Sequence, residues 1–262
     1  MAYEAEKVII INHQRLVALV RKRVTDFAVS QFKGLGSWRD ADIDRFVARV
    51  VPVVEAGQVK TAALTTGYLA AMARIQGFAP AKAVPLPQNL RGVPLTEVYR
   101  RPAVALYSAL SDDPNDLTTA VERGMTLVEQ LAAMDMQMAN VRSAYDMVSN
   151  DDNIVGYQRV LGEDEACALC VLASTQRYHT EDLMPIHDRC MCDVAPIYGK
   201  SDPGQVINSD RYDAFQQRLS DQGVEYTGGA FKSDRSITVN LHGEYGPVLG
   251  WADQAFTGPS DL

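Results

Sequence analysis

The residues best suited to chemistry are cysteines and a histidine in the second half of the chain. Cys167 and Cys170 form a C-x-x-C pair, and sixteen residues later His187, Cys190 and Cys192 form H-x-x-C-x-C. Two thiolates two residues apart can face one ion from a tight turn, and a second, distant pair completes a tetrahedral nitrogen and sulfur site. The spacing predicts a structural zinc site.

Five side chains compete for four positions around such an ion. Cys192 is the main substitute for His187, because Cys190 and Cys192 face the same way if Cys192 already belongs to a strand. His179 is a weaker candidate, since it stands alone in the sequence. The expected ligands are Cys167, Cys170, His187 and Cys190.

Other chemistries also use cysteines at these spacings. A redox C-x-x-C pair belongs at a helix start in a βαβ context and is disfavoured by the two further cysteines. A deaminase-type catalytic zinc needs a Glu at a fixed offset from the His or Cys, which the segment lacks. Disulfide bonds within an extracellular or virion shell stay open. We favour a structural metal that ties two strands and a loop together.

Charge divides the chain near its middle. The 262 residues have a net charge of -8, with 17 basic and 15 acidic side chains in 1–150 against 8 and 18 in 151–262. This shift predicts a domain boundary. A net negative charge argues against a nucleic-acid-binding protein, and the apolar runs are too short for a membrane span.

The first half has the periodicity of helices, with apolar residues at three- and four-residue steps. We expect Ser37 to cap the second helix, Pro52 to bend or break it, and Thr96 to cap the fourth. Five methionines on the last helix are interpreted as adaptable core filling. The predicted elements are helices over 4–31, 37–52, 58–76 and 97–111, a proline-rich connection over 77–95, and a helix of about 30 residues after Pro114 and Asn115.

The second half changes to strand-like alternation. NIVGYQRVLG and DVAPIY are predicted strands, 210–222 is a predicted helix, and SITVNLHGEYGPVLGWADQAF predicts two short strands. His242 and Glu244 suggest a general base pair, but the glycines around them favour a hairpin turn. The fold class is therefore α+β. We expect a helical docking region over 1–150, a small α+β Cys/His domain over 151–200, and a helix, a hairpin and a loop-rich tail over 201–262.

Several of these segments together resemble one family. A helical region that ends in a long helix, then YQRVL, C-x-x-C and H-x-x-C-x-C ahead of an apolar strand, is similar to the phage Mu protein F-like minor head proteins. EVYRRPAVALYSALS, DMQMANVRSA, DEACALCVLA, IHDRCMCDVAPIYG and HGEYGPVL resemble the versions carried by phages of actinobacteria. The resemblance covers most of 90–262, whereas 1–89 fits by helical character and length only.

The resemblance implies a structural minor capsid protein and no enzyme. Such a protein is assembled in the host cytoplasm and lies inside the capsid near the portal vertex, where it acts in head morphogenesis or DNA delivery. Its implied partners are the portal protein and the major capsid protein, in an oligomeric arrangement, with no membrane and no sequence-specific nucleic acid. The alternative is a packaged zinc-dependent enzyme, a nuclease or a transferase, which would keep a water on the metal and a carboxylate such as Asp188 or Asp193 within reach.

Overall fold

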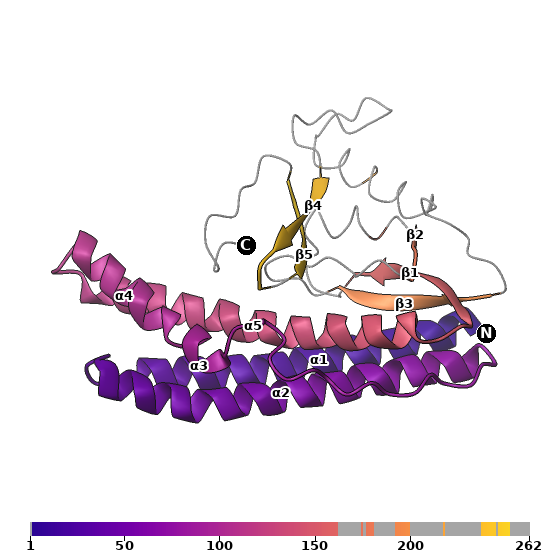
Figure 1. The fold of residues 1–262 in the computed structure, drawn as a ribbon, viewed down its shortest axis with the longest axis horizontal. Coiled ribbons are helices and arrows are strands. Elements are labelled where there is room, and N and C mark those ends of the chain that lie inside the picture. Colours follow the sequence, from indigo (N-terminus) through magenta and orange to yellow (C-terminus); the bar gives the residue numbers. More distant parts are fainter. Residues whose placement is uncertain are drawn as a thin grey trace.

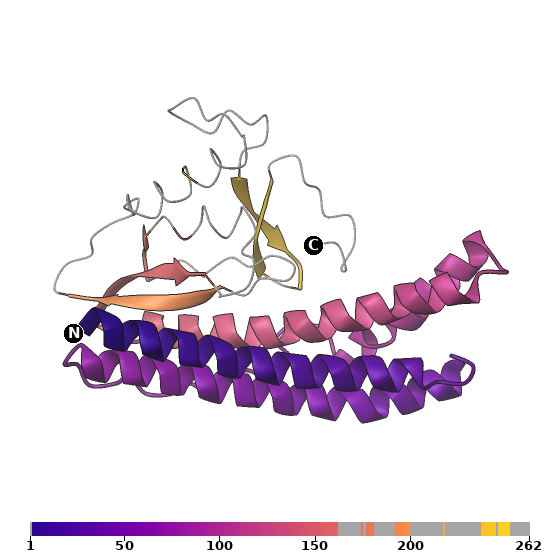
Figure 2. The same cartoon turned by 180° about the vertical axis from the view of Figure 1, so that it is seen from behind.

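A mostly helical body carries a small antiparallel sheet. The computed structural model describes residues 2–161, 174, 177–180, 192–199, 217, 237–244 and 246–251. These residues form five helices and five strands. Three long helices lie side by side along the longest axis of the molecule, and the larger sheet lies against them near one end (Figures 1 and 2). The coarse expectation of an α+β protein is confirmed.

The first two helices form a long antiparallel pair, α1 (Ala2–Lys33) and α2 (Asp40–Ile75). The prediction of two helices separated near Pro52 is wrong, because α2 continues through this proline. A proline inside a helix removes one backbone hydrogen bond and crowds the preceding turn. The side chains of Val50 and Val54 on both sides of it are fully buried in the core, and this burial outweighs the local cost.

The turn between α1 and α2 also differs from the prediction. The N-cap position of α2 is occupied by Arg39 and not Ser37, and the Arg39 side chain makes no capping hydrogen bond. The backbone N–H of Ser37 donates to the Asp42 carboxylate over 3.0 Å, and its hydroxyl donates to the same group. These bonds from Ser37 lower the pKa of Asp42. Trp38 has a φ of 50°, and its indole N–H donates to the Phe32 carbonyl over 3.2 Å, which fixes the tight turn.

Beyond α2 the chain runs back along the helices as the proline-rich connection, in agreement with the prediction (Figure 1). The single helix expected over 97–111 is instead two, α3 (Leu95–Val98) and α4 (Arg101–Asp112). Thr96 lies inside α3 and caps nothing. Pro102 occupies the first turn of α4, where its missing N–H has no partner to lose, so a new helix starts there.

The long helix α5 (Leu117–Ser149) confirms the predicted helix of about 30 residues. Asp116 is its N-cap and accepts from the Thr119 N–H over 3.0 Å, and the hydrogen bonds from Thr119 lower the pKa of Asp116. The expectation of one apolar stripe holds only for the first half, because the second half is buried on nearly all sides between helices and sheet. The core-filling role of the methionines is confirmed for Met134, Met136, Met138 and Met147.

Both predicted strand regions are confirmed. The larger sheet has the order β2-β1-β3, all antiparallel, with β1 (Ile154–Val160), β2 (Arg177–Tyr178) and β3 (Asp193–Tyr198). Pro196 lies on β3 at the edge of this sheet, where no further ladder bond is required of it. The hairpin pairs β4 (Ile237–His242) with β5 (Gly246–Trp251). The predicted helix over 210–222 lies outside the described residues, apart from Gln217.

Two apolar clusters form the core. The first joins α1, the N-terminal half of α2, α4 and the first half of α5, and it includes Phe32, Phe46 and Tyr99. The second joins the other halves of α2 and α5 to the larger sheet through Tyr157 and Val194. The sheet therefore shares a core with the helices, and polar side chains at their boundary must find partners without water.

Candidate functional site

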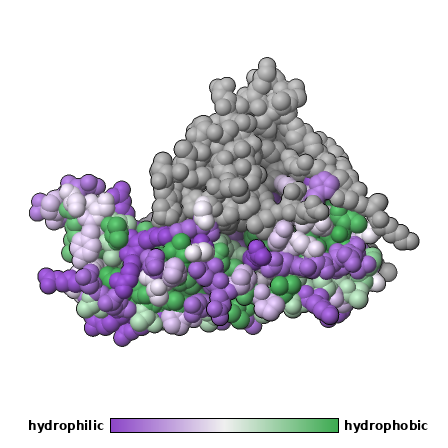
Figure 3. All heavy atoms as spheres, viewed as in Figure 1, coloured by the Kyte–Doolittle hydropathy of each residue, from purple (hydrophilic) through white to green (hydrophobic). Residues whose placement is uncertain are grey.

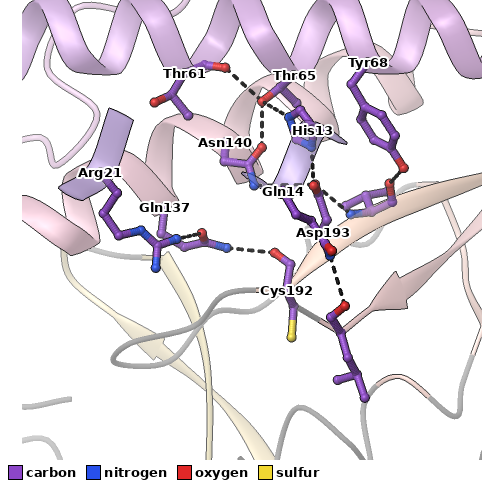
Figure 4. Close-up of polar contacts among 12 residues, drawn as sticks. His13, Gln14, Arg21, Thr61, Thr65, Tyr68, Gln137, Asn140, Cys192 and Asp193 are labelled. Atoms are coloured by element: carbon purple, nitrogen blue, oxygen red, sulfur yellow. Dashed lines mark hydrogen bonds and ion pairs between the residues drawn. The ribbon is translucent and has the colours of Figure 1, made fainter. Parts of the chain in front are cut away.

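Of the five predicted metal ligands, the structure describes Cys192 alone. Cys167, Cys170, His187 and Cys190 lie outside the described residues. Cys192 directly precedes β3 and is 2% exposed. Its sulfur points away from the three long helices (Figure 4). Within the described ranges, no group of three or more His, Cys, Asp or Glu side chains has the arrangement of a metal site.

The backbone carbonyl of this cysteine is attached to the helices. The Cys192 carbonyl accepts from the Gln137 side-chain amide over 3.1 Å. The amide oxygen of Gln137 accepts from Arg21 over 3.0 Å, so a chain of two hydrogen bonds connects α1, α5 and the start of β3. These contacts fix the main chain at Cys192.

The next residue, Asp193, makes buried polar contacts with the helices. Its carboxylate forms an ion pair with Nδ1 of His13 on α1, and the two side chains are 3% and 2% exposed. Asn140 of α5 donates to the other carboxylate oxygen over 3.5 Å, and the Val194 N–H donates to that same oxygen over 3.1 Å. Buried charges in proteins are retained when they are paired and hydrogen-bonded in this way.

The far side of the His13 ring faces α2. Its Nε2 lies 3.3 Å from the hydroxyl of Thr65, which is fully buried. This hydroxyl also lies 2.6 Å from the side-chain oxygen of Asn140 and 3.0 Å from the Thr61 carbonyl. Helices α1, α2 and α5 and strand β3 therefore meet in one polar network (Figure 4), which we call the His13 junction: His13, Thr65, Tyr68, Asn140 and Asp193.

Tyr68 completes the junction from α2. Its ring stacks on the His13 imidazole with 4.4 Å between centroids, and its hydroxyl donates to the Val194 carbonyl over 2.6 Å. Burial raises the pKa of Tyr68 well above its ordinary value, and the negative charge of Asp193 adds to the effect. The phenol therefore stays a hydrogen-bond donor to β3.

The order carboxylate, imidazole and hydroxyl in Asp193, His13 and Thr65 is that of a nucleophilic triad. A nucleophile must be reached by its substrate, however, and Thr65 has no exposed surface. Its hydroxyl is also held in contact with the preceding helical turn. Within the described residues this arrangement is suited to joining elements, not to attacking a substrate.

A second buried network attaches the hairpin to the helices. Glu244, in the β4–β5 turn, forms an ion pair with both terminal nitrogens of Arg101, one of them at 2.8 Å. It also lies 3.4 Å from Arg91, which is fully buried and forms a 2.7 Å ion pair with Asp135 of α5. Tyr99 donates to the same Asp135 carboxylate over 2.8 Å.

The charges of Arg101 and Arg91 change the pKa of Glu244. Burial alone would raise the pKa of Glu244, but the hydrogen bond and charge of Arg101, together with those of Arg91, outweigh it and lower the pKa below its ordinary value. The predicted turn at His242 and Glu244 is confirmed, and Glu244 is a tether between the hairpin and α4.

Sequence reasoning missed both networks. A signal was present, because His13 lies on an apolar face of α1 and Asp135 interrupts an otherwise apolar stretch of α5. A charged or titratable side chain at a core position of a helix requires a partner. The sequence does not identify that partner, since Asp193 follows His13 by 180 residues.

No protein-family model, curated protein or solved structure matches this chain. Among the helices of the described ranges, none has the length and apolar character needed to cross a membrane.

Proposed function

We propose that this chain is a structural minor head protein of a tailed bacteriophage, associated with the portal inside the head and acting in head morphogenesis or DNA delivery. The observation that carries the proposal is the attachment of the segment after H-x-x-C-x-C to a body of long helices. The resemblance in sequence implies a portal-engaging helical part joined to a small α+β part with Cys and His ligands. The His13 junction provides such a joint between α1, α2, α5 and β3.

The joint also supports a mechanical role. The sheet makes buried contacts with three helices at once, and the hairpin is tethered separately through Glu244. A force or displacement applied to the helical body would reach the second half through several attachments that do not depend on a single loop. Such multiple attachment suits a protein that positions one part of a particle relative to another.

Zinc is proposed as a structural component of the second half. The donor set of four thiols and one imidazole is of the kind that binds zinc in closed tetrahedral sites. Cys192 fits such a role, because its sulfur points away from the helices while its carbonyl is fixed by Gln137. The metal would hold together two distant stretches of chain, and Cys167, Cys170, His187, Cys190 and Cys192 would compete for its four positions.

Co-purification with the portal tests the proposed location. The chain is co-expressed with the portal protein of the phage that encodes it, and a portal from an unrelated phage is the control. We expect a complex that elutes with the cognate portal ring alone, and the chain among the proteins of purified virions by mass spectrometry. Absence from both the cognate complex and the virion would overturn the proposal.

Metal analysis tests the zinc site and separates a structural from an enzymatic metal. We expect one zinc per chain and loss of that zinc in Cys167→Ser and Cys170→Ser. X-ray absorption should show four nitrogen and sulfur ligands. An oxygen ligand from water would instead favour the packaged zinc enzyme, and a chain without zinc whose cysteines resist alkylation would favour disulfide bonds.

A further inference from the structure

Exposed apolar side chains gather at two separate places on the helices. Of the nine large hydrophobic side chains that are exposed in the described residues, three lie on one stretch of α1, two on α4 and one at the start of α5. The first group is Val8, Leu16 and Leu19, and the second is Val104, Tyr107 and Leu117. Such clustering on a protein surface is typical of sites that contact another macromolecule.

The first group lies within a purely basic stretch of sequence. Between Lys7 and Arg23 there are five Lys or Arg side chains and no Asp or Glu. Successive residues of a helix are rotated by 100°, so the exposed residues of this stretch fall on one side of α1. This side faces away from the other helices. We call this surface the basic stripe: Val8, Arg15, Leu16, Leu19, Lys22 and Arg23.

The second group lies within a purely acidic stretch. Between Val104 and Glu122 there are four Asp or Glu side chains and no Lys, Arg or His. Asp112 and Asp113 are exposed at the end of α4, and Asp112 forms a long, exposed ion pair with Arg123 at 4.0 Å. We call this surface the acidic tip: Val104, Tyr107, Asp112, Asp113 and Leu117.

The two surfaces lie far apart within one molecule. The basic stripe belongs to the N-terminal two-thirds of α1, and the N-terminus of α1 is at the opposite end of the helical body from α4 (Figures 1 and 2). The α4–α5 turn extends away from the α1–α2 turn, and Figure 3 shows hydrophobic and hydrophilic side chains side by side on this projection. One copy therefore cannot bring its own stripe and tip together.

We propose that the acidic tip of one copy docks on the basic stripe of a second copy. Each surface carries three exposed apolar side chains, and basic charges predominate on the stripe and acidic charges on the tip. Two of these charges have a partner within the same copy, because Lys22 pairs with the exposed Asp26 and Asp112 with the exposed Arg123. Arg15 and Arg23 on the stripe and Asp113 on the tip leave the two surfaces opposite in sign, so the contact combines apolar burial with electrostatic complementarity. A membrane or an unrelated basic partner would match one of the two surfaces, whereas a second copy matches both. Because the contact joins different surfaces, it is head to tail and generates a ring or an open chain of copies.

The inference concerns the purified protein and stands whether or not the portal is its partner. Sedimentation velocity of the full chain, under reducing conditions to prevent intermolecular disulfides, measures the association over a concentration series at 50 and 500 mM salt. We expect concentration-dependent dimers and larger species that dissociate at the higher salt, because screening weakens contacts between exposed charges.

Charge reversal on each surface identifies the contact. Variant one carries Arg15→Glu and Arg23→Glu, and variant two carries Asp112→Lys and Asp113→Lys. Each alone should associate about tenfold or more weakly than the unmodified chain. An equimolar mixture should regain association. The unaltered acidic tip of variant one can dock on the unaltered basic stripe of variant two. The altered tip of variant two, now basic, can dock on the altered stripe of variant one, now acidic.

The control variant carries Lys60→Glu and Lys82→Glu, which reverse two exposed charges outside both surfaces. It should associate like the unmodified chain, and circular dichroism spectra of all variants should coincide. The proposal is overturned if the unmodified chain stays monomeric to about 200 μM at low salt, or if mixing the two reversed variants restores nothing.

Discussion

The imidazole of His13 and the carboxylate of Asp193 form a buried ion pair across 180 residues of sequence. One partner belongs to the first helix and the other opens the strand that follows the H-x-x-C-x-C segment. The contact therefore forms only when β3, in the second half of the chain, is packed on α1 in the first half.

Replacing His13 by Ala should destabilise the protein by about 3–5 kcal/mol, because the Asp193 carboxylate would stay buried without the imidazole that faces it. Urea unfolding followed by circular dichroism measures the loss. Asn12→Ala changes an exposed neighbour on the same helix and should stay within about 0.5 kcal/mol of the unmodified protein.

The double variant His13→Leu with Asp193→Leu separates burial of a charge from loss of a contact. An apolar pair of similar volume removes the buried carboxylate together with the imidazole, so most of the lost stability should return. If His13→Ala costs no more than Asn12→Ala, the ion pair is not a determinant of stability.

Tyr68→Phe and Tyr107→Phe form a matched comparison of one hydroxyl in two environments. Tyr68 donates to the Val194 carbonyl at a buried site, and Tyr107 donates to the Trp38 carbonyl over 3.0 Å with 45% of its surface exposed. We expect a loss of about 1–3 kcal/mol for Tyr68→Phe, since a buried carbonyl is left without this donor. The loss for Tyr107→Phe should be below about 0.5 kcal/mol, because water replaces the donor. Equal losses in the two variants would contradict the assigned role of Tyr68.

Glu244→Gln tests the tether of the hairpin through its dependence on pH. Because the pKa of Glu244 is lowered in the folded state, its carboxylate stabilises the fold above its unfolded pKa of about 4.3, and this contribution is lost as the pH falls through the lower folded value. At pH 7 the variant should be less stable by about 1–3 kcal/mol.

This difference should shrink below about pH 4.5 and vanish once the glutamate of the unmodified protein is protonated. Urea unfolding at pH 7, 5, 4 and 3 measures it, with Glu129→Gln as the exposed control on α5. If the difference in stability between Glu244→Gln and the unmodified protein stays constant over this range, the charge of Glu244 does not contribute to the tether.

Replacement by Ala should have opposite effects on stability at Gly57 and at Gly67, which both lie on α2. A Cβ at Gly57 would lie 2.6 Å from a methyl carbon of Val24 and 2.9 Å from the Met136 sulfur, whereas nothing lies within 4 Å of a Cβ at Gly67. Gly57→Ala should therefore cost about 1–3 kcal/mol through overpacking between three helices. Gly67→Ala should add up to about 1 kcal/mol of stability through helix propensity. Thermal unfolding of both variants checks the contrast, and a stabilising Gly57→Ala would mean that the helices can separate at little cost.

The helices and strands were largely predictable because each carries a local signal. The apolar period of α1, the Asp116 start of α5 and the alternation of β1 depend on neighbours in sequence. Pro52 misled the prediction for the opposite reason, since the core around Val50 and Val54 is built by helices distant in sequence and overrides a local breaker.

The sequence indicates that certain buried polar side chains need a partner, but it does not identify that partner. His13, Arg91 and Asp135 are unusual at core positions, and this signal is local. Their pairing with Asp193 and Glu244 depends on the packing of sheet and hairpin on the helices, which no short-range pattern encodes. The Cys/His spacing points to chemistry through four residues outside the described ranges, so the metal site stays a prediction.

The length of chain between His13 and Asp193 has a consequence for synthesis. At roughly 5–20 residues per second, the ribosome makes Asp193 about 9–36 seconds after His13. All residues of helices α1, α2 and α5 have been synthesised before that time, whereas Asp193, the partner of the His13 imidazole, has not. During this interval the helices can assemble while the strand that supplies Asp193 is still to be made, so the polar side chains of the His13 junction lack their partners on β3 until that strand is synthesised.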